Sequence, residues 1–367
     1  MQRPTFLDVL EARSTIAPYV ARTPLISYAG LNKFIGAEVR LKHENHHPLG
    51  AFKVRGGINL LAHSTEEQRR QGFITASTGN HGQSVANACR IFGARAIIAM
   101  PEGANPLKVE SMRNLGAEVL FQGRNFDEAR EYTERLSKEE GYRYVHAANE
   151  PLLVSGVATC YLEVVEDFPQ VEYILAPLGG GSGASGACIV AKAINPDIKV
   201  IAVQSEQAPA GYLSWKKGSV VEAPMNTVAE GLATQSGYEF PQSVLRDLLD
   251  DFVLVSDAEI GEAIGLLIEK AHTLAEGAGA AALAGAVKIK ERLQGKNVAV
   301  VVSGATSPWS DCVRPSATAH RRRASDRLTA LLVRRRYRQI AAPNLDSPLT
   351  LAATMGNGIP NRRHTFS

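Results

Sequence analysis

Residues 47–57 read HPLGAFKVRGG, which places a single lysine, Lys53, beside an aromatic residue and among three glycines. A lysine amine attacks a carbonyl group only when it is deprotonated, and an apolar shell or a neighbouring cation such as Arg55 lowers its pKa toward that state. Most lysines are instead solvated surface residues. Lys53 is therefore a candidate nucleophile, and its assignment depends on the motifs that surround it.

The chain has 367 residues, of which 45% are hydrophobic, so it can bury a large core and form two domains. No apolar run reaches the roughly 18 residues that a membrane helix needs, and the N-terminus lacks the apolar segment of a secretory signal. We therefore expect a soluble, cytoplasmic protein. The cysteines have no CxxC spacing, which predicts neither a zinc site nor a disulfide framework, and three of them are expected to be small core residues. They are Cys89, Cys160, Cys188 and Cys312.

The net charge of +3 averages two unlike regions. Residues 305–367 contain eleven arginines, three aspartates and no lysine or glutamate, a net charge of +8, which leaves −5 for residues 1–304. A protein that reads nucleic acid is expected to carry a basic face on its folded part. The mildly acidic body instead indicates an enzyme with a small-molecule substrate, and neither a nucleic-acid nor a membrane partner is predicted.

Strand and helix patterns alternate through most of the chain. This is the order of βαβ units on a parallel sheet, in which ligands bind at the C-terminal ends of the strands. The sequence predicts an α/β protein with two doubly wound α/β domains and mostly parallel sheets. The predicted strands include residues 38–42, 73–76, 94–100, 118–121, 173–177, 199–204 and 298–302, and the predicted helices include residues 5–21, 54–63, 82–92, 126–140 and 256–273.

A polar turn, STGNHGQS at residues 77–84, follows the predicted strand 73–76 and leads into an apolar helix. The backbone N–H groups at the start of a helix form an anion site, which suits a carboxylate or a phosphate. A simpler interpretation is that Ser77 or Thr78 only caps the helix. The other polar side chains of the turn have no part in a cap, so the sequence favours a binding role.

A glycine-rich turn, LGGGSGASG at residues 178–186, follows the predicted strand 173–177. Backbone amides of such a turn close on phosphate oxygens, and the dipole of the next helix adds its field. Two interpretations compete. Gly181, Gly183 and Gly186 match the GxGxxG fingerprint of an NAD-binding oxidoreductase, with Glu206 as its ribose-binding acid. The alternative is a cup for a single phosphate group, and the glycine motif does not decide between them.

Four motifs together resemble the fold-type II pyridoxal phosphate enzymes, whose fold is that of the tryptophan synthase β subunit. These motifs are the Lys53 stretch, the turn at residues 77–84, the glycine loop at residues 179–183 and the strand end VVSG at residues 301–304. The resemblance covers roughly residues 5–304, and it is strongest to the threonine dehydratase and serine racemase group. It implies pyridoxal 5'-phosphate as the cofactor.

The resemblance assigns a role to each motif. Lys53 forms the Schiff base with the cofactor, Asn80 contacts the hydroxyl group of its ring, and Ser303 hydrogen-bonds its pyridine nitrogen. The glycine loop holds the phosphate group, Phe52 shields one face of the ring, and Glu276 lies near it. The implied cofactor-binding set is Lys53, Phe52, Asn80, Gly179, Gly180, Gly181, Ser182, Gly183, Glu276 and Ser303.

The substrate carboxylate is expected on the backbone around Ser77, Thr78, Gly79 and His81. Lys53, once the substrate amine has displaced it, is the expected base for the α-proton. The resemblance thus implies an ammonia-lyase that converts L-threonine or L-serine to a 2-oxo acid and ammonia by β-elimination, and it implies a homodimer. The alternatives within the group are a serine racemase and a dehydratase of another substrate such as hydroxyaspartate or phenylserine.

Three departures from the pattern of the family bear on this interpretation. Racemases of the group carry a serine as a second base at the position of Thr78, where many dehydratases have alanine, so Thr78 is a candidate second catalytic residue. Ser182 replaces the fourth glycine of the phosphate loop, and its hydroxyl group is able to donate to phosphate. At the divalent-cation site of the family, Glu206 and Ala210 align but Tyr212 replaces an acid, so no metal is predicted.

The resemblance also implies domain boundaries. Residues 1–64 and 150–304 form the expected larger, cofactor-binding domain, and residues 65–149 form the smaller domain that holds the substrate carboxylate. Residues 305–367 are an atypical arginine-rich tail outside the fold. This tail is interpreted either as the product of a shifted reading frame or as a basic arm for nucleic acid or membrane, which its lack of lysine disfavours. If the tail disrupts the fold, the chain is an inactive binding protein.

Overall fold

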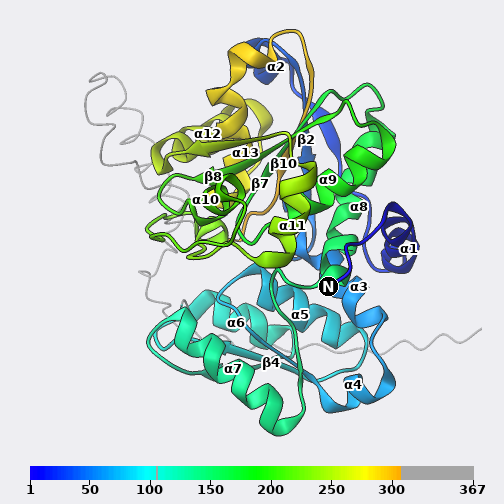
Figure 1. The fold of residues 1–367 in the computed structure, drawn as a ribbon, viewed down its shortest axis with the longest axis vertical. Helices are drawn as coiled ribbons and strands as arrows, with labels where there is room; N and C mark the ends of the chain where they lie inside the picture. Colours follow the sequence, from blue (N-terminus) through cyan, green and yellow to red (C-terminus); the bar gives the residue numbers. More distant parts are fainter. Residues whose placement is uncertain (105, 307–367) are drawn as a thin grey trace, which may run out of the picture. The chain divides into compact units, whose positions relative to one another are not determined.

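The computed structural model describes residues 1–104 and 106–306, which belong to one compact unit. Two separate sheets organise these residues (Figure 1). Of the predicted tail, residues 307–367 lie outside the described residues, and Cys312 is among them. The domain boundaries implied by the resemblance stay a prediction.

The larger sheet has six described strands. They are β1 (Leu25–Ser27), β2 (Glu38–His43), β7 (Tyr173–Pro177), β8 (Lys199–Ser205), β9 (Asp251–Val255) and β10 (Asn297–Val302). Their order across the sheet is β1-β2-β10-β7-β8-β9. β1 is antiparallel to β2, and all other neighbours are parallel. Parallel neighbours need crossover connections, and helices supply them here.

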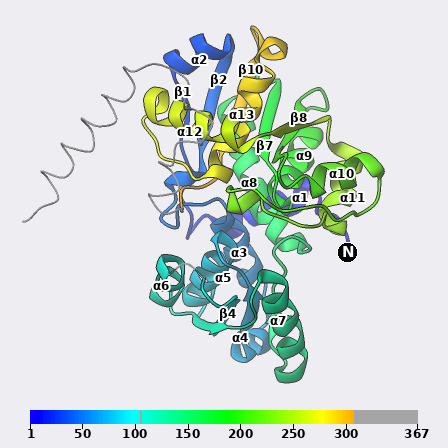
Figure 2. The ribbon, with the colours of Figure 1, turned by 90° about the vertical axis from the view of Figure 1, so that its left-hand side faces the viewer.

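Helices cover both faces of the larger sheet (Figures 1 and 2). They are α1 (Phe6–Ile16), α2 (Ala29–Ile35), α8 (Pro151–Asp167), α9 (Ser182–Ile194), α10 (Ala210–Lys217), α11 (Glu239–Leu248), α12 (Asp257–Ala271) and α13 (Gly277–Lys288). Successive side chains of a strand point to opposite faces. Ile174 and Ala176 of β7 therefore pack with α8 and α9, whereas Leu175 packs with α12 and α13. No helix of the described residues is long and apolar enough to cross a bilayer.

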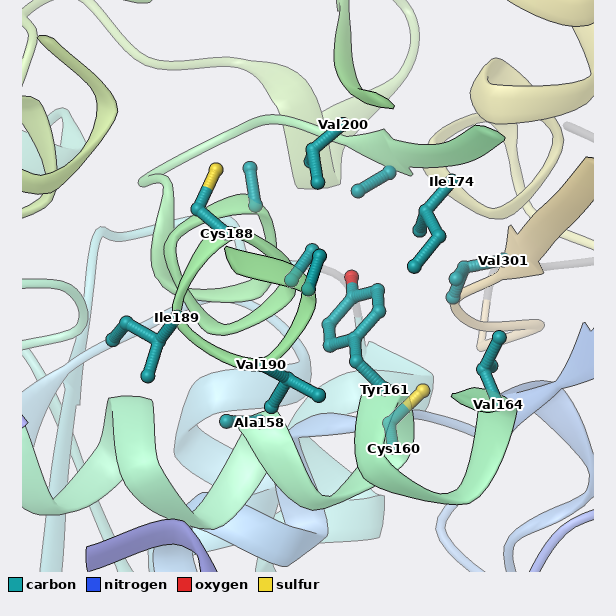
Figure 3. Packing of buried hydrophobic residues seen from close by; sticks show 14 of the residues in the cluster. Ala158, Cys160, Tyr161, Val164, Ile174, Cys188, Ile189, Val190, Val200 and Val301 are labelled. Carbon is teal, nitrogen blue, oxygen red and sulfur yellow. The ribbon is translucent and has the colours of Figure 1, made fainter. Parts of the chain in front are cut away.

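Figure 3 shows the packing on the first of these faces, where Tyr161 and Cys160 of α8 and Cys188 of α9 lie among aliphatic side chains such as Ile174. The described cysteines, these two and Cys89, are buried and unpaired. Their expected role as small core residues is confirmed.

The smaller sheet has four described strands, all parallel, in the order β5-β4-β3-β6. The strands are β3 (Phe73–Ala76), β4 (Ala96–Met100), β5 (Glu118–Phe121) and β6 (Arg143–Tyr144). The helices of this part are α3 (Lys53–Ala62), α4 (Glu66–Gln71), α5 (Asn80–Ile91), α6 (Pro106–Asn114) and α7 (Phe126–Glu140). The short 3-10 helices of the described residues are η1 (Glu44–His46), η2 (Glu230–Leu232) and η3 (Lys290–Leu293). Every residue of β4 is buried, as a parallel sheet covered on both faces requires. The predicted α/β class with two mostly parallel sheets is confirmed.

One helix boundary differs from the prediction in a way that affects the site. α5 begins at Asn80, not at residue 82, so Asn80 and His81 lie in its first turn. The hydroxyl group of Ser77 accepts the N–H of Gly82 at 2.9 Å, which satisfies a donor that the first turn leaves unpaired. The helix can therefore start two residues earlier than its apolar pattern indicates.

Candidate active site

The loops that follow β3, β7 and β10 meet at one pocket beside the start of α3. Pro177, Gly231, Leu232 and Ala278 line part of it. The rest of the lining is the complete set of residues that the sequence predicts to bind a cofactor, namely Phe52, Lys53, Asn80, Gly179, Gly180, Gly181, Ser182, Gly183, Glu276 and Ser303. Residues far apart in the chain share this pocket because the carboxyl end of β3, in the smaller sheet, meets the carboxyl ends of β7 and β10, in the larger sheet.

Lys53 is the first residue of α3 and lines the pocket. Burial lowers the pKa of Lys53 to about 8, although the Glu276 carboxylate opposes this shift. Its amine lies 5.5 Å from the centroid of the Phe52 ring, and it makes no hydrogen bond or ion pair with another residue that the structure describes. An amine with this pKa is partly neutral near pH 8, which is the form that a nucleophile or a base requires.

Two hydrogen bonds fix the backbone around Lys53. The hydroxyl group of Ser84 donates to the carbonyl oxygen of Lys53 at 2.6 Å. The N–H of Phe52 donates to the carbonyl oxygen of Ser303 at 3.1 Å. The lysine is thus tied both to α5, which carries Ser84, and to the end of β10.

A close crossing of α3 and α8 fixes the rest of the helix. A Cβ added at Gly156 would lie 2.7 Å from the carbonyl oxygen of Arg55, and one added at Gly56 would lie 2.8 Å from that of Leu153. Real Cβ atoms do not approach a carbonyl oxygen so closely, so only glycine permits this contact. Gly56, the first of the two glycines that follow Arg55, therefore has a packing reason.

Arg55 lies two residues after Lys53, but its guanidinium group binds two buried carboxylates. It donates to Glu44 at 2.7 and 2.8 Å and to Glu163 at 2.7 and 2.9 Å. Lys42 completes this Arg55 cluster with an ion pair to Glu163 at 2.6 Å, and all four side chains are buried. The prediction that Arg55 lowers the pKa of Lys53 is wrong, because the two carboxylates neutralise its charge and burial causes the shift.

Backbone N–H groups of the glycine loop form a donor cup between β7 and α9. Gly181, with a φ of 96°, is the N-cap of α9, a conformation that favours glycine. The N–H groups of residues 179–184 donate to no described residue, nor does the hydroxyl group of Ser182. These donors lie at the positive end of the α9 dipole, so they suit a phosphate group.

The loop between β3 and α5 carries a second set of donors. The hydroxyl group of Ser77 accepts the N–H groups of Gly79 and Gly82 at 3.2 and 2.9 Å. Three other backbone N–H groups of the loop donate to no described residue, and they belong to Thr78, Asn80 and His81. The hydroxyl group of Ser77 thus serves the helix start, while these three N–H groups can bind an anion.

The His81 side chain is bound to the smaller sheet. Its Nε2 lies 3.0 Å from Oγ1 of Thr75 and 3.2 Å from the carbonyl oxygen of Val145. Burial and, to a smaller extent, the charge of Lys53 lower the pKa of His81 to about 3. The imidazole is therefore neutral near pH 7, and the backbone N–H is the part of His81 that can meet a ligand.

Three side chains form a hydrogen-bonded group at the pocket. Asn80 Nδ2 donates to Glu276 Oε1 at 2.8 Å, and the hydroxyl group of Thr306 donates to Glu276 Oε2 at 2.7 Å. The same hydroxyl group contacts Asn80 Oδ1. Thr306 is absent from the predicted site because no motif includes it. Its position three residues after Ser303, at the end of β10, is the signal that could have indicated it.

Two of the residues that the dinucleotide interpretation needs, Gly186 and Glu206, do not line the pocket. Glu206 follows β8, is exposed, and accepts a hydrogen bond from Gln207 Nε2 at 3.1 Å. Gly186 serves helix packing, since a Cβ there would lie 2.9 Å from Cα of Ala158 in α8. The geometry therefore favours the phosphate cup. Among residues 1–104 and 106–306, no three His, Cys, Asp or Glu side chains are placed to hold a metal ion.

Comparisons with known proteins agree with this geometry. Residues 16–304 match the family described as pyridoxal-phosphate dependent enzymes. An L-threonine ammonia-lyase of Thermotoga maritima is 40% identical over 301 residues, which are 82% of this chain and 75% of that protein. A catabolic L-threonine dehydratase of Staphylococcus aureus is 38% identical over 303 residues, 81% of this chain and 87% of that protein. The structure of maize serine racemase matches with a TM-score of 0.82 at 28% identity, over 92% of this chain and 100% of that chain.

Proposed function

This chain belongs to the family of pyridoxal-phosphate dependent enzymes, and on that premise we propose that it is an ammonia-lyase for a hydroxy amino acid such as L-threonine or L-serine. The reaction is a β-elimination, in which the substrate loses its α-proton and its β-hydroxyl group as water. The enamine that results takes up water, and it releases ammonia and a 2-oxo acid. The observation that carries the proposal is the Lys53 amine, with a pKa of about 8, beside two sets of unpaired backbone donors.

The pocket residues fit the cofactor. The donor cup of residues 179–184 suits its phosphate group, and the amine of Lys53 suits its aldehyde. Three side chains remain for the ring, with Phe52 at one face, Asn80 at the ring hydroxyl and Ser303 at the ring nitrogen. When bound, the cofactor supplies an electron sink that stabilises negative charge at the α-carbon of the substrate.

Replacing Gly179 with alanine tests the donor cup. A Cβ at this position would lie 2.1 Å from the carbonyl oxygen of Gly231, so the loop must shift. We expect the affinity of the apoprotein for pyridoxal phosphate, measured by fluorescence titration, to fall about tenfold or more. Gly261→Ala in α12 is the matched control, because a Cβ there meets no atom within 4 Å. Equal affinities of the two variants would contradict the role of the cup.

Lys53 has two roles in the proposed reaction. It would hold the cofactor through its carbonyl group, and as a free amine Nζ would take the proton from the substrate α-carbon. A pKa of about 8 suits both roles, because the neutral fraction of the amine near physiological pH is then far larger than that of an ordinary lysine. The N–H groups of Thr78, Asn80 and His81 hold the substrate carboxylate, which orients the α-carbon toward Nζ.

Thr78 bears on the alternative that the enzyme also racemises serine. A racemase needs a second base on the face of the α-carbon opposite Lys53, and the hydroxyl group of Thr78 makes no hydrogen bond with a described residue. We expect Thr78→Ala to change elimination by less than about threefold and to remove any racemisation, since a general base contributes about 10²–10⁴-fold. Chiral chromatography of serine after incubation measures this. D-serine formed equally by the wild type and the variant would exclude Thr78 as the second base.

An absorption spectrum of the purified protein tests the proposed cofactor. We expect a visible band from the bound cofactor that Lys53→Ala removes. We expect 2-oxo acid and ammonia from L-threonine or L-serine in a panel that includes 3-hydroxyaspartate and phenylserine. A protein without this band that binds NADH would instead be an oxidoreductase, and the proposal would fail.

We also propose that the enzyme is a cytoplasmic homodimer, which the family resemblance supports. Light scattering of the purified protein measures its mass in solution, and cell fractionation measures its location. A monomer that retains full activity would contradict the dimer.

A further inference from the structure

The turn after β10 brings Thr306 to Asn80 and Glu276, two residues that line the pocket. The N–H of Ala305 donates to the carbonyl oxygen of Gly50 at 2.9 Å, and Gly304 pairs with Ala51 in an isolated bridge. Gly50 has a φ of 64°, and a Cβ added there would lie 3.1 Å from the methyl group of Thr306. These contacts fix Thr306 on the segment that leads into α3.

Thr306 binds one oxygen of the Glu276 carboxylate twice. Its N–H and its hydroxyl group lie 3.2 and 2.7 Å from Oε2. The other carboxylate oxygen, Oε1, accepts the Asn80 amide at 2.8 Å. Asn80 starts α5 beside the smaller sheet, whereas Glu276 precedes α13 beside the larger sheet. Thr306 therefore joins side chains that belong to the two different sheets.

We propose that Thr306 is a positioning residue that fixes the Glu276 carboxylate and the Asn80 amide relative to the Lys53 amine. The inference rests on the proposed function, because Lys53 and Asn80 are the groups expected to contact the cofactor. Among the described residues, the charge of Glu276 raises the pKa of Lys53, and the charge of Lys53 lowers the pKa of His81. His81 is neutral near pH 7, since its pKa is about 3, so the charge that acts on Lys53 is that of Glu276.

The hydroxyl group of Thr306 holds the Glu276 carboxylate, which carries this charge, in place. Without it, Oε2 keeps only the backbone N–H and Oε1 keeps only the Asn80 amide, so the carboxylate is held less firmly and is able to turn toward the ammonium group of Lys53. Opposite charges attract strongly in a buried site. This rotation of the Glu276 carboxylate raises the pKa of Lys53 and lowers the fraction of neutral amine near pH 8.

The rate at which the apoprotein binds pyridoxal phosphate, followed by stopped-flow absorbance against pH, reports the neutral fraction of Lys53 without turnover. We expect Thr306→Val, which keeps the shape but not the hydroxyl group, to raise the midpoint of this profile by about half a pH unit or more. Its affinity for pyridoxal phosphate is expected to fall about fivefold. Thr306→Ser, which keeps the hydroxyl group, is the matched control and is expected to restore both values.

A double-mutant cycle separates positioning from a purely structural role. In the Glu276→Gln background the charge is absent, so Thr306→Val is expected to leave the midpoint unchanged. The inference is overturned if Thr306→Val raises the midpoint of the pH profile equally in the Glu276→Gln background. It is also overturned if Thr306→Val alone has the same midpoint as the wild type. Should the valine variant not fold, Thr306→Ala takes its place in the same cycle. Wild-type apoprotein that binds no pyridoxal phosphate would instead overturn the proposed function.

Discussion

Replacement of Lys53 by methionine is expected to reduce elimination to the uncatalysed background and to make the apoprotein more stable at neutral pH. Turnover is lost because the variant has neither the amine that binds the cofactor nor the base for the α-proton. Stability rises because burial lowers the pKa of Lys53 from 10.5 to about 8, so the folded protein disfavours the protonated amine. Methionine fills a similar volume without a charge.

The gain in stability depends on pH in a defined way. Below pH 8 the amine is protonated in the folded and the unfolded chain, and its full burial cost is present. Between pH 8 and 10.5 the unfolded chain binds more protons than the folded protein, so wild-type stability rises with pH. Above pH 10.5 both states are neutral and the cost disappears. The shift corresponds to about 3 kcal/mol at most, which is the expected advantage of the variant at pH 7.

Urea unfolding of the two apoproteins at pH 7 and above pH 10 measures this difference, and a coupled assay for 2-oxo acid measures turnover. Lys33→Met, which replaces an exposed lysine of α2, is the matched control and is expected to keep wild-type stability and turnover. Residual turnover in Lys53→Met, or an apoprotein less stable than the wild type at pH 7, would contradict the assignment of Lys53.

Arg55→Met is expected to lower the free energy of unfolding by about 3–5 kcal/mol, because it leaves two buried carboxylates without their shared cation. Lys42 still pairs with Glu163, whereas Glu44 keeps only Thr23 and His47 as side-chain partners. Methionine has a similar length and no charge, so it cannot replace the four hydrogen bonds of the guanidinium group. Glu44 would then carry uncompensated charge in the core, and Glu163 would depend on Lys42 alone.

The same substitution is expected to change stability in acid. Burial raises the pKa of Glu44, but Arg55 and His47 outweigh it and hold that pKa well below 4.5. The stability that this interaction contributes is present above pH 4.5 and is lost as the pH falls through the lowered pKa. In Arg55→Met this acid-dependent loss is expected to be smaller, since the contribution is already absent at neutral pH.

Urea unfolding at pH 7 and pH 4 measures both effects of Arg55→Met. Arg22→Met is the matched control, because Arg22 pairs with Glu166 and Asp167 while its side chain is 48% exposed. Such a surface pair contributes about 1 kcal/mol or less. Equal losses in the two variants would contradict the importance of the Arg55 cluster. Arg55→Lys keeps one charge and serves as the second variant if Arg55→Met does not fold.

Local signals in the sequence predict several elements with their observed ends. The strands Phe73–Ala76 and Tyr173–Pro177 are short apolar runs, each followed by a polar or glycine-rich turn. The helix Phe126–Glu140 begins after Asn125, whose side chain caps it, and ends before Gly141 in a left-handed conformation. The ends of these strands and of this helix are set by residues that lie next to them in the sequence, so the sequence predicts them. β1 has three residues and no pattern of its own, and it is defined by its pairing with β2.

The sequence by itself predicted the chemistry of the candidate site. Lys53 and the glycine loop stand out by residue type and local pattern, whereas the roles of the loop and of Ser303 follow from the resemblance of four motifs to the family. Only the tertiary structure decided the environment of these groups. Burial sets the pKa of Lys53, two distant carboxylates take the charge of Arg55, and Thr306 meets Glu276. Packing decides which side chains are buried and which side chains from distant segments form hydrogen bonds and ion pairs. No local sequence pattern encodes these contacts.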